Sequence, residues 1–130
     1  IFNPLAQKNF KYIRKQCMQL PSKMRFLSQQ FITLLSTGLW LEIADHGFSM
    51  AQYLASSIEG IKGLRLTQKV QANSVFVQIP KAWTKDLKDE AFFYVWDEED
   101  WIMRWMMSFD TDKEQLDRFI KKIKVLAEKL

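Results

Sequence analysis

The sequence has few of the residues from which metal and nucleotide sites are built. Its 130 residues include one cysteine, Cys17, and one histidine, His46. A single cysteine excludes a disulfide within the chain, and no Cys/His spacing of a zinc site is present. The four glycines are isolated from one another, so the chain has no glycine-rich phosphate loop. We therefore predict no metal site and a reducing, cytoplasmic setting.

A clustered basic face and a long apolar run are also lacking. The formal net charge is +4 and the pI about 9.2, but the cations are interleaved with 15 Asp and Glu. Nucleic-acid binding usually needs a gathered basic patch, so we predict no nucleic-acid partner. The most apolar segment, residues 26–44, carries Gln29, Gln30 and Glu42 and is too polar to span a membrane. Its spacing predicts a largely buried helix instead.

Four helical segments are predicted from apolar spacing and end signals. Residues 5–19 form a basic helix stopped by Pro21, and Ser22 can cap the next helix, over residues 23–41. Residues 44–60 continue helically with Phe48, Met50, Ala51, Leu54, Ala55 and Ile58 inward, and Gly60 and Gly63 bracket the end. The last helix begins with a Thr111–Glu114 capping box and lines Leu116, Phe119, Ile120, Ile123 and Leu126 on one face.

Strands are predicted between the last two long helices. The segments are "LRLTQ", "SVFVQIP", "FFYVWDE" and "WIMRWMMSF", with a short helical stretch at "KAWTKDLKDE". The polar run "DEED" between the last two segments predicts a hairpin. The expected fold class is therefore α+β, a small antiparallel sheet packed with helices.

Arg104 is the candidate site residue that the strand pattern itself reveals. In "WIMRWMM", Ile102, Arg104 and Met106 share one face of the strand, so one cation lies among apolar neighbours. A guanidinium stays charged and is costly to bury unpaired. It either pairs with an internal acid such as Asp97 or Glu99, lies at a sheet edge, or binds a ligand carboxylate in a fork. The pattern leaves these readings open.

Two further features have simpler explanations than catalysis. His46 follows Asp45 near an expected helix start, where a capping or helix-end role is the default. Asp97, Glu98, Glu99 and Asp100 form an acidic turn, which is more often a solvated loop than a cation site.

A family resemblance emerges from several segments in order. The segments, in order, are "SKMRFLSQQF", "LWLEIADHGFSMAQYLA", "ANSVFVQIP", "FFYVWDE" and "MRWMMSFDT" followed by a helix. Together they resemble the C-terminal part of the threonine aldolase and β-eliminating lyase family. These are pyridoxal-phosphate enzymes of the aspartate-aminotransferase fold, fold type I. The resemblance implies that residues 1–42 are a linker and long helix joining a large domain. Residues 43–130 would be the small C-terminal α+β domain.

The resemblance also implies roles for four cations. Arg104 matches the strand arginine that grips the substrate's α-carboxylate. Arg25 matches an arginine near the cofactor site that helps to bind the phosphate or to complete a neighbouring subunit's site. Arg14 and Lys15 resemble the basic pair before it, so these three residues are expected to be cofactor-binding. No catalytic residue falls in this chain, since the Schiff-base lysine is expected upstream of Ile1. We therefore expect a fragment that is inactive alone and does not bind pyridoxal phosphate covalently. Its implied partners are an amino-acid substrate, its own large domain and further copies in a dimer or tetramer.

The chain also departs from the family pattern. Typical threonine aldolases have a glycine run before the Met-Arg pair, where this chain has "QLPSKMR". The substrate thus stays open among threonine, allo-threonine and an aromatic amino acid. A β-eliminating lyase acting on another amino acid and a noncatalytic interaction module are the alternatives to an aldolase.

Overall fold

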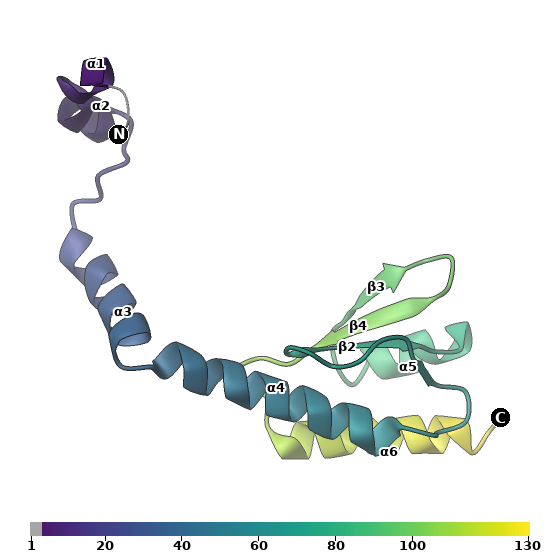
Figure 1. Ribbon diagram of the computed structural model, residues 1–130. Coiled ribbons are helices and arrows are strands. Elements are labelled where there is room, and N and C mark those ends of the chain that lie inside the picture. The colour runs from purple at the N-terminus through teal and green to yellow at the C-terminus, as the bar shows by residue number, and fades with distance from the viewer. Residues whose placement is uncertain (1–3) are drawn as a thin grey trace. The chain divides into compact units, whose positions relative to one another are not determined.

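The computed structural model describes residues 4–130, in two compact units (Figure 1). The first ends at Trp40 and the second runs from Leu41 to Leu130. Residues 1–3 at the start of the chain lie outside the described residues. The proposed division into a linker and a small domain at residue 42 stays a prediction.

The basic segment at the start is two short helices, so the prediction of one helix over residues 5–19 is wrong. They are α1 (Pro4–Gln7) and α2 (Phe10–Gln16). The stop at Gln16 comes well before Pro21, because Met18 adopts a positive φ of 55°. The amide of Gln19 donates to the Arg14 carbonyl at 2.9 Å, which closes the helix end as a Schellman motif.

The second predicted helix is shorter and more exposed than its apolar pattern suggested. α3 spans Met24–Ser36, and its N-cap is Lys23 rather than Ser22. Gly38, with a φ of +80°, then interrupts the helix, and α4 (Leu39–Ile58) begins directly after it. None of the residues of α3 is buried, and Phe26 and Phe31 are 71% and 65% exposed. The prediction of a largely buried helix is therefore wrong for this segment as it stands in the chain.

A four-stranded antiparallel sheet forms the centre of the second unit. Its strands are β1 (Arg65–Leu66), β2 (Ser74–Gln78), β3 (Tyr94–Asp97) and β4 (Ile102–Met106), in the order β1-β2-β4-β3. β3 and β4 form the predicted hairpin. A 3-10 turn, η1 (Lys81–Trp83), and α5 (Thr84–Lys88) connect β2 to β3. The α+β fold class is thus confirmed.

Two long helices cover one side of this sheet. α4 and α6 (Lys113–Ala127) lie side by side (Figure 1) and are joined by a hydrogen bond from Tyr53 to Asp117. A further hydrogen bond links His46 of α4 to the Thr111 backbone in the turn before α6. The buried core between helices and sheet includes Leu54 and Ile58 of α4, Val75 and Val77 of β2, Met103 and Trp105 of β4, and Phe119 and Ile123 of α6. The alternation in β4 and the apolar stripe of α6 are both confirmed.

The start of α6 differs from the prediction by one residue. Asp112 is the N-cap: its side chain accepts a hydrogen bond from the Gln115 amide at 2.7 Å, and the Gln115 side chain accepts one from the Asp112 amide. Thr111 instead accepts, through Oγ1, a hydrogen bond from the Ser108 amide at 2.8 Å. The predicted Thr111–Glu114 capping box is therefore wrong, because Thr111 closes the turn that precedes the helix.

Candidate functional site

Arg104 lies on the face of the sheet opposite α4 and α6. Its strand, β4, runs between β2 and β3, and its direct cross-strand neighbours are Phe76 and Tyr94. The alternation explains this placement, since Met103 and Trp105 on either side of Arg104 are buried against the helices. The reading that Arg104 lies at a sheet edge is wrong, because β4 is an inner strand.

The structure does not pair this guanidinium with an acid. Within residues 4–130, neither Asp97 nor Glu99 forms an ion pair with Arg104; the ion pair found joins Lys122 to Asp86 at 3.2 Å. Asp97 is engaged elsewhere, because its Oδ1 accepts hydrogen bonds from the Glu99 and Asp100 amides at 2.9 and 3.0 Å. The reading that an internal acid neutralises Arg104 is therefore wrong for the described part of the chain.

The groups that do contact the guanidinium are neutral. Nη2 of Arg104 donates to the thioether sulfur of Met106 at 3.3 Å, and Cζ lies 5.5 Å from the centroid of the Trp96 ring. A thioether is a weak acceptor, so this contact leaves most of the guanidinium's hydrogen-bonding capacity unused. Its Nε is buried and has no acceptor among the described residues. The arrangement can bind an anion without first breaking an ion pair.

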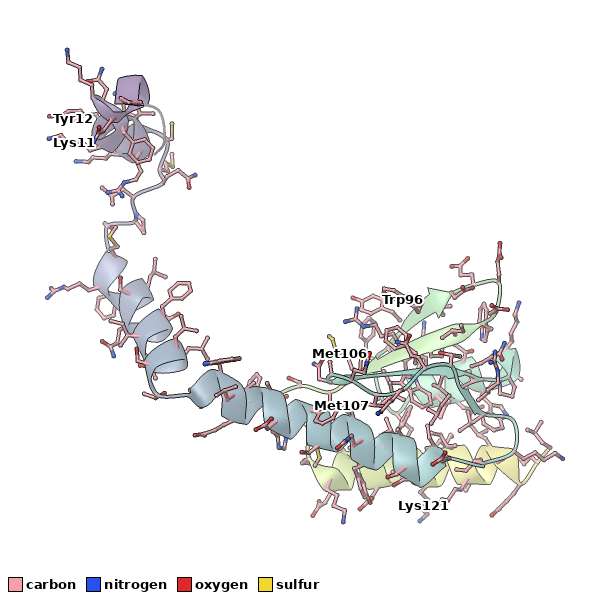
Figure 2. The ribbon with its side chains drawn as sticks, viewed as in Figure 1. Lys11, Tyr12, Trp96, Met106, Met107 and Lys121 are labelled. Carbon is pink, nitrogen blue, oxygen red and sulfur yellow. The ribbon has the colours of Figure 1, made fainter. Side chains whose placement is uncertain are left out.

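Trp96 is the site residue that our sequence reasoning missed. Its ring packs edge-on against Phe76, with centroids 5.4 Å apart and an interplanar angle of 78°. Figure 2 shows Trp96 and Met106 on the side of the sheet away from α4 and α6. Strand alternation places Tyr94 and Trp96 on the same face, which was a usable signal. The pairing register that brings Trp96 to Arg104 could not be read from one sequence.

The other predicted site residues belong to the first unit. Arg14 and Lys15 lie in the last turn of α2, and Arg25 lies in the first turn of α3. The side chains of Lys15 and Arg25 are exposed, whereas Arg14 is half-buried, with an Nε that lacks an acceptor among the described residues. These three cations therefore belong to the first unit, and Arg104 belongs to the second.

His46 has a different role from the one predicted. It lies within α4, well past the helix start, and its Nε2 is 2.8 Å from the carbonyl oxygen of Thr111. The capping interpretation is wrong, because the helix already begins at Leu39. His46 instead ties α4 to the turn that leads into α6.

The described residues lack two further kinds of feature. No cluster of three or more His, Cys, Asp or Glu side chains there could hold a metal ion. In the same part of the chain, no helix combines the length and the apolar character that crossing a membrane requires.

Comparisons with known proteins bear on what this arrangement does. No protein-family model matches the chain. A low specificity L-threonine aldolase from a Pseudomonas species is 36% identical over 115 residues, which cover 88% of this chain and 33% of that protein. The Pseudomonas aeruginosa enzyme of the same description is 34% identical over 126 residues, covering 96% of the chain and 36% of the relative. The chain is similar to threonine aldolases.

The solved structures agree with this similarity. A Leishmania major threonine aldolase matches with a TM-score of 0.77 and 26% identity, over 98% of this chain and 38% of that one. The chain spans about a third of the length of the curated relatives it matches.

Proposed function

We propose that this chain is the C-terminal part of a pyridoxal-phosphate-dependent lyase that cleaves a β-hydroxy amino acid to glycine and an aldehyde. The similarity to low specificity threonine aldolases over 88% and 96% of the chain supports the reaction class. Because the match spans only about a third of each relative, the remaining catalytic parts would belong to a longer protein. The C-terminal position follows from the family resemblance.

The role of Arg104 in this proposal is to anchor the substrate's α-carboxylate. The observation that carries the assignment is a half-buried guanidinium on an inner strand, with no acid paired to it among the described residues. A carboxylate meets a guanidinium through two parallel charge-assisted hydrogen bonds, which fix both position and orientation. Held in this way, the substrate presents one Cα bond for cleavage in a fixed direction.

The cofactor assignment rests on the cations of the first unit. Arg14, Lys15 and Arg25 are cationic donors of the kind that bind a phosphate, and the first turn of α3 has no side-chain cap on its amides. Donors of this kind suit the phosphate of pyridoxal phosphate, and in this proposal Arg25, Arg14 and Lys15 would hold that group. When bound, the cofactor supplies the electron-withdrawing ring that takes up the electron pair of the broken Cα bond.

The 130-residue chain by itself is proposed to be inactive. By the resemblance, the lysine that binds the cofactor covalently lies outside this chain. Incubation with pyridoxal phosphate followed by borohydride reduction and mass spectrometry tests this point. Stoichiometric labelling of one lysine would contradict it.

The test of the function uses the longer protein in which this chain is proposed to occur. Release of glycine and aldehyde from threonine, allo-threonine and phenylserine is measured for the wild type, Arg104→Lys and Arg104→Ala. We expect kcat/KM to fall about 30-fold to 1000-fold for Arg104→Ala, because both hydrogen bonds and the charge are lost. The kcat/KM of Arg104→Lys should lie between those of the wild type and Arg104→Ala, since lysine keeps the charge but cannot form the two parallel hydrogen bonds.

Matched controls separate anchoring from folding. Arg118→Ala removes an exposed arginine of α6 and should leave kcat/KM unchanged. The absorbance of bound cofactor should be normal in every variant. A folded Arg104→Ala enzyme with normal kcat/KM would end the carboxylate assignment. Formation of a keto acid and ammonia in place of glycine and an aldehyde would favour the β-eliminating alternative. The absence of any reaction would favour a noncatalytic module.

A further inference from the structure

The position of the Trp96 ring depends on an irregularity in β3. Val95 pairs with Met103, but the next pair joins Asp97 to Ile102, so Trp96 is an extra residue in this strand. Such a bulge twists the strand locally and re-aims a side chain. Here the re-aimed residue lies on an edge strand, yet its ring reaches Phe76 on β2, on the far side of β4. Arg104 lies on the strand that the ring crosses.

The Trp96 ring contacts both Phe76 and the guanidinium of Arg104. Phe76 packs edge-on against the indole at 5.4 Å, which restricts the ring's rotation, and the ring lies 5.5 Å from Cζ of Arg104. The negative face of an indole attracts a cation, and a flat ring limits the directions in which a guanidinium can point. Trp96 is 60% exposed, so core packing alone does not account for its placement.

A neutral support has a functional advantage over an acidic one. An acid next to Arg104 would fix its orientation but would also occupy the hydrogen-bonding edge that an incoming carboxylate needs. The ring face restrains the guanidinium without competing for that edge. The Met106 sulfur, at 3.3 Å from Nη2, is too weak an acceptor to displace a carboxylate.

We propose that Trp96 is the positioning residue of Arg104: braced by Phe76, its indole ring holds the guanidinium ready for a carboxylate. The carboxylate half of this inference rests on the proposed function, whereas the contact between Trp96 and Arg104 does not. The buried Nε of Arg104 provides a direct probe, because its N–H is shielded from water and has no acceptor among the described residues.

The experiment uses the 130-residue chain labelled with ¹⁵N. The Arg104 Nε–H signal is assigned with Arg104→Lys, and its shift and exchange with water are recorded in Trp96→Ala, Trp96→Phe and Phe92→Ala. We expect Trp96→Ala to move the signal and speed its exchange at least about tenfold, because a ring current and a cover are both lost. Trp96→Phe should largely restore both. Phe92 is another exposed aromatic residue beside Tyr94 and serves as the matched control.

Titration with formate, a minimal carboxylate, then measures anion binding at the same signal. We expect Trp96→Ala to weaken formate binding about 2-fold to 5-fold, as a lost cation–π contact would, with Phe92→Ala unchanged. If Trp96→Ala leaves the Arg104 signal and its exchange like those of Phe92→Ala, the positioning role is overturned. If formate does not move the wild-type signal, the carboxylate half is overturned together with the proposed anchor. The formate-free spectra distinguish these two failures. If Trp96→Ala does not fold, Trp96→Leu keeps apolar bulk but has no aromatic face, and it should still move the Arg104 signal; an unmoved signal in that variant would overturn the positioning role.

Discussion

Tyr53 of α4 donates its hydroxyl hydrogen to Asp117 Oδ1 of α6 at 2.5 Å. This bond joins the two helices that cover the sheet, and it favours the protonated tyrosine. The hydrogen bond to Asp117, followed by burial and the negative charge of Asp117, raises the pKa of Tyr53 above its ordinary value of 10.0. The contact is therefore sensitive to alkaline pH.

The pH dependence of this contact can be predicted in sign. Because the pKa is raised in the folded chain, the stabilisation is fully present below pH 10 and is lost as the pH rises through the folded value. We expect Tyr53→Phe to lower the free energy of unfolding at pH 7 and to converge with the wild type at high pH. Urea unfolding from pH 7 to 11 measures this. Tyr12→Phe, at an exposed tyrosine of α2, is the control and should unfold with the same free energy as the wild type. A difference in free energy between Tyr53→Phe and the wild type that stays constant from pH 7 to 11 would contradict the prediction.

Gly47 is buried in α4 where the loop before β2 comes close. A Cβ at this position would lie 3.1 Å from the Asn73 Cβ and 3.7 Å from the Met107 carbonyl oxygen. We expect Gly47→Ala to change stability by less than about 1 kcal/mol, since the better helix propensity of alanine offsets the crowding. Gly47→Leu should cost about 1 to 3 kcal/mol by overpacking.

Chemical denaturation measures both Gly47 variants, with Ser49→Leu as an exposed control on the same helix. A Gly47→Leu variant as stable as the Ser49→Leu control would show that the loop moves aside freely.

The N-terminus of α6 gives a prediction that distinguishes the Asp112 N-cap of the structure from the Thr111–Glu114 capping box expected from the sequence. Asp112→Ala removes the side chain that accepts from the Gln115 amide and should cost about 1 kcal/mol. Glu114→Ala, which would break the capping box expected from the sequence, should cost only a few tenths of a kcal/mol. Thermal unfolding of the two variants decides between them. Equal losses of stability in the two variants would contradict the assignment of Asp112 as the N-cap.

The apolar surface of α3 predicts self-association of the chain. Phe26, Phe31 and Leu35 are 71%, 65% and 59% exposed, which is unusual for large apolar side chains on one short helix. We expect light scattering to detect species larger than the 15.5 kDa chain, and Phe31→Glu to reduce them. Lys15→Glu, an exposed change on α2, is the control for altered charge. A wild-type chain that is strictly monomeric at high concentration would contradict this prediction.

Local patterns sufficed for the elements whose neighbours are close in sequence. Alternation in "WIMRWMM" identified the buried and open faces of β4, and the spacing of Leu116, Phe119 and Ile123 identified the buried face of α6, because these periods belong to strands and helices themselves. The turn at residues 97–100 likewise predicted the hairpin. Gly60 and Gly63 predicted that the helix ends near residue 60, and in the structure α4 ends at Ile58 and both glycines have positive φ angles, of 77° and 89°.

The tertiary structure decided what those faces meet. Strand order shows that Arg104 lies inside the sheet, and the pairing of β3 with β4, with its bulge at Trp96, brings that ring to the guanidinium. The sequence pattern of α3 looked like that of a buried helix, yet burial depends on a surface to pack against, which the described chain does not provide for Phe31. Periodicity is a property of the segment itself, whereas pairing, register and burial depend on residues distant in the chain.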